Sequence, residues 1–142
     1  MPIRNCIVAH MSDTEVNSQV TRSVVLDAGL DDVWAAVADP ERRRLWLDDE
    51  DAQARAWRVD HEAPGRSLTW TWWHPEDPAG ASQVEVVLDE EPDGATRLVV
   101  TERLVQPTPA ATSRMRASAG VTWGSRLLGL ELLLVAAVAL VR

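Results

Sequence analysis

The sequence predicts an α+β protein in which an antiparallel sheet of five to six strands curves around one long C-terminal helix. The helix is predicted from residues 120–142, where only Gly129 and Glu131 interrupt the apolar residues between Leu127 and Val141. Leu and Ala dominate this stretch, and both are good helix formers. A helix this apolar has to be covered on most sides, since a surface helix shows a polar face. The preceding segments are typical of short strands, so we expect a sheet to wrap the helix.

The same stretch is too short for a predicted membrane span. At about 1.5 Å of rise per residue, its uninterrupted apolar part reaches roughly 22 Å, whereas the hydrocarbon core of a bilayer is about 30 Å thick. Arg126 and Glu131 would also be costly in lipid. We therefore expect a buried helix of a soluble protein and no stable membrane insertion. A tail that leans on a membrane, or a helix partly buried against a second subunit, is the alternative.

Composition narrows the class of protein. The chain has 142 residues, enough for one domain with a real core. Its formal net charge of −8 argues against a nucleic-acid partner, which would require a basic face. Phe and Tyr are absent, so the seven Trp residues supply every aromatic contact. Cys6 is the only cysteine, which excludes an intrachain disulfide and favours a reducing, cytoplasmic location.

The first half of the chain is predicted to hold one strand and two short helices. Residues 1–18 show no period and are expected to form a flexible extension ahead of a single domain over residues 19–142. Gln19 to Asp27 is rich in β-branched residues and is predicted to be a strand. Leu30 to Ala38 has helical spacing of apolar residues, and a second helix is predicted from Pro40 to about Leu47, with Asp39 as its N-cap.

Two charged runs follow in or after the second helix. Arg42, Arg43 and Arg44 are expected to form a solvated face, which balances the acidic run from Asp48 to Asp51. That acidic run is itself expected to be a solvated loop.

The second half of the chain is predicted to form an antiparallel meander. Turn residues recur at the regular spacing that separates short strands. The predicted strands are Ala54 to His61, Arg66 to His74, Ser82 to Asp89 and Ala95 to Val105. A loop is expected from His74 to Gly80, and a polar connector from Gln106 to Ala119.

The two short helices carry the most specific motif. Val33-Trp34, Asp39-Pro40 and Trp46 form the pattern VW-x4-DP-x5-W. In this pattern, and in the order of its elements from about Gln19 onward, the chain resembles the SRPBCC superfamily, the helix-grip fold of START and birch-pollen-allergen-like proteins. The resemblance is closest to the branch named after the activator of the ninety-kilodalton heat-shock chaperone's ATPase. It implies that Trp34 and Trp46 pin the two helices to the core.

The chain also departs from that family in two places. Family members usually have two full strands after the second helix, where only Leu47 to Arg55 is available here, so one strand is expected to be shortened or lost. The Gly-Trp pair that often opens the last helix is displaced, because two residues separate Gly120 from Trp123.

The resemblance implies that a small hydrophobic or lipid-like ligand binds in an internal cavity between sheet and helix. We expect no cofactor and no metal. Alternation along the strands indicates which side chains could face the cavity. If Trp70 and Trp72 point inward, so does His74; if Trp57 points inward, so does His61. Glu102 shares a face with Leu98 and Val100. The candidate ligand-binding residues are Trp57, Trp70, Trp72, His74, Glu102 and Trp123.

Each candidate has a purely structural alternative. The two His residues stand at strand ends, where side chains usually reach water, and Trp70 could belong to the packed core. Glu102 could be turned outward by a bulge or paired with an Arg. The three His residues show no metal-ligand spacing.

Two other classes of function remain open. A polyketide cyclase or aromatase-like enzyme would use Glu102 or a His as general acid or base. A chaperone-associated interaction module would instead show an exposed apolar patch.

The tail from Leu132 to Val141 contains no polar residue, although one face of a gripped helix normally meets water. We expect that face to pack against a second copy in a symmetric homodimer. The alternative is that Ile3 to Val8 folds back over it.

Overall fold

The computed structural model describes residues 18–141, with side chains described from residue 18 to residue 136. The expectations for the N-terminal extension and for Cys6 therefore lie outside the described residues. The elements, in chain order, are β1 (Gln19–Leu26), α2 (Leu30–Ala38), α3 (Pro40–Trp46), α4 (Glu50–Gln53), β2 (Ala56–Ala63), β3 (Ser67–His74), β4 (Asp77–Glu90), β5 (Thr96–Leu104) and α5 (Pro109–Val141).

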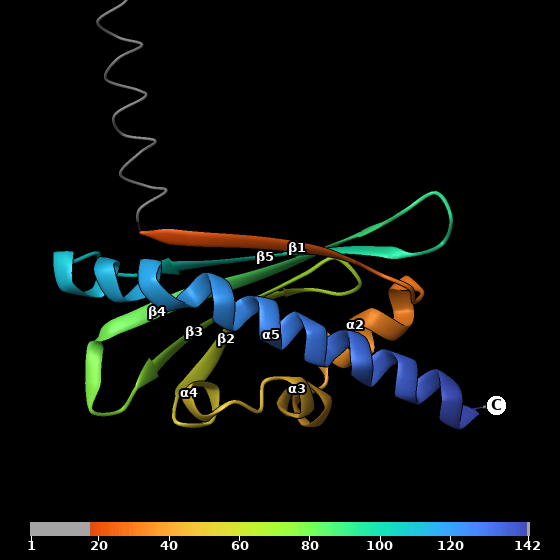
Figure 1. The fold of residues 1–142 in the computed structure, drawn as a ribbon, viewed down its shortest axis with the longest axis horizontal. Coiled ribbons are helices and arrows are strands. Elements are labelled where there is room, and N and C mark those ends of the chain that lie inside the picture. Colours follow the sequence, from red (N-terminus) through yellow and green to blue (C-terminus); the bar gives the residue numbers. More distant parts are fainter. Residues whose placement is uncertain (1–17, 142) are drawn as a thin grey trace, which may run out of the picture.

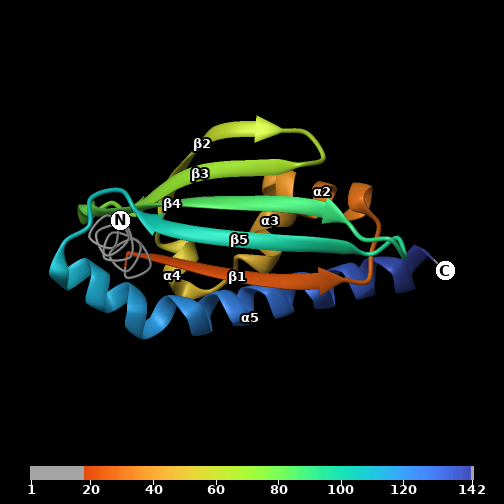
Figure 2. The same ribbon diagram turned by 90° about the horizontal axis from the view of Figure 1, so that it is seen from above.

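The five strands form one antiparallel sheet in the order β1-β5-β4-β3-β2. Figures 1 and 2 show the helices on one face of this curved sheet, with α5 running along its length. Inward side chains of the strands and of α2, α3 and α5 form one hydrophobic cluster. The predicted α+β helix-grip class is confirmed. No strand forms between Leu47 and Arg55, where the sequence predicts a shortened or lost strand.

Helix α5 begins at Pro109, so the predicted connector up to Ala119 is wrong for most of its length. The Thr108 hydroxyl accepts a hydrogen bond of 3.1 Å from the Ala111 amide, as an N-cap does. Pro109 then occupies the first helical position, where its missing N–H costs nothing. The polar first turns of the helix conceal its start from a search for apolar periodicity.

Two predicted loops are also ordered elements. Strand β4 begins at Asp77, which pairs with His74, so a tight hairpin replaces the expected loop up to Gly80. The short helix α4 begins within the acidic run, and the Asp49 carboxylate caps it by accepting a 3.1 Å bond from the Ala52 amide. That run is therefore not a solvated loop.

A bulge in β2 overturns the inward orientation of His61. The pairing with β3 shifts register between Val59 and His61, and the extra residue exchanges the faces of the side chains that follow. His61 pairs with Thr69 and is exposed. It therefore faces away from the core.

The pattern VW-x4-DP-x5-W has a physical basis at the junction of α2 and α3. The Ala36 carbonyl near the end of α2 would normally bond the amide N–H four residues on, but that residue is Pro40, which has none. The indole of Trp46, 2% exposed, donates to this carbonyl at 3.0 Å instead. Arg43 donates to the next carbonyl, that of Val37, at 3.2 Å.

This arrangement corrects the expectation for the arginine run. Arg43 is buried, at 5% exposure, and its guanidinium carbon lies 4.4 Å from the centroid of the Trp57 ring. Arg42 and Arg44 are exposed, as expected. One arginine of the three thus belongs to the core, because the last carbonyls of α2 require donors there.

Trp46→Ala should lower the free energy of unfolding by about 3–5 kcal/mol, because it empties a large buried site. Trp34, which the sequence predicts to be a second core pin, is only partly buried against the core, so Trp34→Ala should cost less. Urea unfolding of both variants measures the difference. Equal losses would contradict this account of the junction.

The outer face of α5 carries a stripe of exposed apolar side chains. Val121, Leu128, Leu132 and Val135 are between 56% and 74% exposed. Three of them stand seven residues apart, the repeat of a helix that packs against another helix. By length and composition, residues from Pro109 to Ala136 could also cross a membrane, although core helices of soluble proteins share these properties. The fold itself is that of a soluble α+β protein.

A symmetric homodimer through this α5 stripe stays a prediction. In a symmetric dimer the same apolar stripe of one copy would pack against that of the other. The alternative is that Ile3 to Val8 fold over the stripe, and these residues lie outside the described ones. Sedimentation velocity should show a dimer for the wild type and a monomer for Leu128→Glu. Leu45→Glu, at an equally exposed apolar position on α3, is the matched control and should leave the dimer intact. A wild-type monomer would contradict the prediction.

Candidate functional site

A buried carboxylate stands at the centre of the candidate site. Glu102 on β5 is 4% exposed and faces inward, as the strand alternation predicts. Its Oε2 accepts a 2.9 Å bond from the indole N–H of Trp72, and its Oε1 accepts a 2.8 Å bond from that of Trp123. The Ser82 hydroxyl also donates to Oε2. The outward orientation of Glu102 is therefore excluded.

These four side chains come from four different elements. Trp72 on β3 pairs across the sheet with Ser82 on β4, and β5 lies beside β4, so the three side chains share the inner face. Trp123 comes from α5, and its ring stacks on Trp72 with centroids 6.0 Å apart. An indole N–H can only donate, so each buried Trp requires an acceptor. Glu102 supplies acceptors for two of them.

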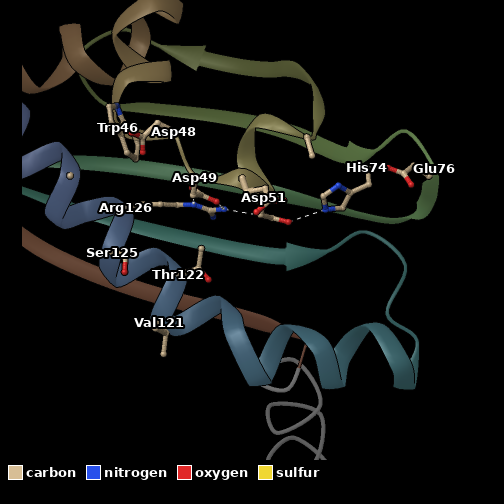
Figure 3. Close-up of a pocket in the computed structure, with 13 residues that line it drawn as sticks. Trp46, Asp48, Asp49, Asp51, His74, Glu76, Val121, Thr122, Ser125 and Arg126 are labelled. Carbon is tan, nitrogen blue, oxygen red and sulfur yellow. Dashed lines mark hydrogen bonds and ion pairs between the residues drawn. The ribbon is translucent and has the colours of Figure 1, made fainter.

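Arg126 joins α5 to the acidic run (Figure 3). Its side chain is 3% exposed, and its Nε and Nη2 donate to the two oxygens of Asp49 at 2.8 and 2.9 Å. Nη2 also donates to Asp51 at 3.0 Å. The guanidinium carbon lies 4.7 Å from the Trp123 ring centroid. Three acceptor contacts and an aromatic face thus compensate a charge that is almost wholly buried.

These contacts shift the pKa values of Asp49, Asp51 and Arg126. Burial alone would raise the pKa of Asp49, but the hydrogen bonds and charge of Arg126 outweigh it and the pKa is lowered. Burial likewise opposes the ionisation of Asp51, and the charges and bonds of Arg55, His74 and Arg126 lower its pKa overall. Burial would lower the pKa of Arg126, but its carboxylate partners raise it. The network therefore holds its charged form at neutral pH.

His74 extends the network toward solvent, as Figure 3 shows. Its Nε2 lies 2.9 Å from Oδ1 of Asp51, and 35% of its side chain is exposed. Arg55 also binds Asp51, through Nε at 3.1 Å. A histidine oriented by an ionised carboxylate is an arrangement that can move protons.

Three cavities surround these residues. The first, of about 380 Å³, lies between the strand ends and the N-terminal half of α5, and it is bordered by Glu102, Ser82, His74 and Met115 among others. The second, of about 420 Å³, is bordered by Trp57, Trp72 and Arg55 at the β2 edge. The third, of about 750 Å³, is the open acidic groove beside Arg126 drawn in Figure 3.

The six predicted site residues do not line one shared cavity. His74 and Glu102 border the first cavity, whereas Trp57 and Trp72 border the second. Trp70 and Trp123 are fully buried and border none of the three. The indoles fill the space that the sequence assigns to a Trp-lined cavity, with Trp57 and Trp70 centroids only 5.4 Å apart.

Sequence reasoning missed Asp49, Asp51, Arg55 and Arg126, which organise the site. The sequence did contain one indication of this group. Arg126 follows Trp123 by three residues, so the two side chains share one face of the apolar helix, and this face is buried. A buried arginine requires acidic partners, and the nearest acidic run is far away in sequence. Among the residues that the structure describes, no group of His, Cys, Asp and Glu could hold a metal ion.

No protein-family model and no curated protein sequence matches this chain. Solved structures do. MLL2253 from Mesorhizobium loti is 22% identical, with a TM-score of 0.68 over 82% of this chain and 96% of that chain. CalU16 from Micromonospora echinospora is 25% identical, with a TM-score of 0.65 over 82% and 75% of the two chains. DynU16, a protein in the dynemicin biosynthetic locus, is 21% identical, with a TM-score of 0.59 over 80% and 46%. They support the helix-grip fold but not the chaperone-activator branch.

The lowered pKa values of Asp49 and Asp51 predict a loss of stability in acid. A carboxyl group with a depressed folded-state pKa stabilises the fold above its unfolded value, near 3.8, and loses that contribution as pH falls through the folded value. Asp49→Asn keeps the helix cap but weakens the bonds to Arg126, and should cost about 1–3 kcal/mol at pH 7. The difference from wild type should shrink below pH 4, in urea unfolding followed against pH.

Asp48→Asn is the matched control, since this neighbouring side chain is exposed. It should change the stability at pH 7 by less than about 0.5 kcal/mol. If Asp48→Asn and Asp49→Asn change the free energy of unfolding equally, the Asp49–Arg126 pair does not hold the segment after α3 against α5.

Proposed function

We propose that this protein binds a small, mainly apolar molecule with one hydrogen-bonding group in the cavity of about 380 Å³ beside Glu102. The observation that carries the proposal is a buried carboxylate at the inner end of a cavity of ligand size. Pockets for small molecules combine a volume of about 300–1,000 Å³ with a few convergent polar groups. The cytoplasmic location that the single cysteine suggests is part of the same proposal.

The walls of this cavity support a ligand of mixed character. Leu104, Ala111 and Met115 supply buried apolar surface. Glu102 and Ser82 supply the polar end, and a ligand N–H or O–H donor would suit the carboxylate. His74 and Glu102 border this cavity, whereas none of the four Trp residues among the predicted ligand-binding residues does.

The structural neighbours are consistent with binding of a small organic molecule. DynU16 belongs to the dynemicin biosynthetic locus, and its likeness to this chain is one of fold. The proposal for this chain therefore depends on its own cavity.

Binding can be tested with N-phenyl-1-naphthylamine, a neutral apolar probe that carries one N–H donor. Its fluorescence should rise saturably with the wild-type protein. Ser118→Phe places a ring at the cavity wall and should weaken binding at least about tenfold, which corresponds to 1.4 kcal/mol. Ser113→Phe, at an exposed position on the same helix outside the cavity, should leave binding unchanged. Equal effects of the two variants, or no saturable binding, would refute the proposal.

One observation favours an enzyme, such as a polyketide cyclase or aromatase-like protein, as a second candidate. The His74–Asp51 pair borders the same cavity as Glu102, which places two proton-transfer groups beside one bound molecule. An enzyme would return a bound polyketone chemically changed, as mass spectrometry would show. The change should be lost in His74→Gln and kept in His61→Gln, whose side chain is exposed away from the core.

A further inference from the structure

We propose that the second cavity, of about 420 Å³ at the β2 edge of the sheet, binds a planar aromatic anion such as an aryl carboxylate. Its lining residues are Arg44, Leu47, Ala52, Gln53, Arg55, Trp57 and Trp72. The cavity is separate from the one beside Glu102, so this proposal does not rest on the proposed function.

The aromatic preference follows from the indole walls. Trp57 is partly buried and Trp72 is 1% exposed, and their ring centroids lie 6.2 Å apart at an angle of 57°. Buried Leu47 and Ala52 complete an apolar surface beside them. A flat ring gains both dispersion and aromatic contacts against such walls.

The preference for an anion follows from two arginines whose hydrogen-bonding capacity is not fully used. Arg55 binds Asp51 through Nε and Nη2, but its Nη1 is buried and has no hydrogen-bond partner. Within the described residues, Arg44 makes no hydrogen bond and no ion pair with a carboxylate. A guanidinium N–H without an acceptor is costly, and Arg44, which is exposed and lines the cavity, can donate to a ligand carboxylate there.

The local charge supports the same ligand. The chain carries a net charge of −8, yet no acidic residue lines this cavity. The guanidinium carbon of Arg43 lies 4.4 Å from the Trp57 ring centroid, and burial together with the like charge of Arg44 lowers the pKa of Arg43. An anion bound beside Arg44 in the cavity would reduce the repulsion between Arg44 and Arg43, and a carboxylate matches guanidinium geometry with two parallel bonds.

Isothermal titration calorimetry with 2-naphthoate tests the proposal. The wild type should bind it saturably, more weakly at high salt because the interaction is ionic. Arg44→Gln should weaken binding about tenfold, the effect of one lost charge-assisted hydrogen bond. Arg42→Gln is the matched control, two residues earlier on α3 and outside the cavity, and should bind as the wild type does. Both side chains are exposed, so neither change should impair folding.

Two further ligands test the chemical class. 2-Naphthamide keeps the ring without the charge, and octanoate keeps the charge without the ring; both should bind at least about tenfold more weakly than 2-naphthoate. Ser118→Phe, which blocks the other cavity, should leave 2-naphthoate binding intact. Equal binding of naphthamide and naphthoate, equal effects of the two arginine variants, or no binding at all would overturn the proposal.

Discussion

The interior of this protein depends on one buried guanidinium. Arg126 is almost wholly buried, so its charge must be met by carboxylates, and Asp49 and Asp51 supply them from a distant part of the chain. These ion pairs hold the segment after α3 against α5, and that segment stands where a strand would otherwise lie. A buried pair is not by itself a source of stability. Its consequence is orientation, because one of the two carboxylates, that of Asp51, also positions Arg55 and His74.

The chain has Trp but no Phe and no Tyr, so each of these aromatic rings that enters the core brings an N–H donor with it. Glu102 accepts from Trp72 and Trp123, and the Ala36 carbonyl accepts from Trp46. These bonds explain why a carboxylate lies inside an otherwise apolar sheet face. The indole N–H of Trp70 is buried without a partner, so the matching of donors and acceptors is incomplete at that position.

The same packing divides the space beneath the sheet. Arg55 and Trp72 stand between the cavity beside Glu102 and the cavity at the β2 edge, and Arg55 borders both. One cavity ends at a carboxylate, and the other is lined by two arginines and no acidic residue. The two cavities therefore suit ligands of opposite hydrogen-bonding character, and one element, the segment that replaces a strand, shapes them both.

The sequence by itself determined the class of fold, the bounds of α2, the junction at Asp39-Pro40 and the inward direction of Glu102, because these follow from local spacing and strand alternation. It did not reveal the early start of α5, since polar first turns look like a loop. The orientation of His61 depended on a bulge in its pairing with β3, which no local pattern indicates. Only the tertiary structure brought Asp49 and Asp51 to Arg126, because those partners are far apart in sequence and meet solely through the packing of α5.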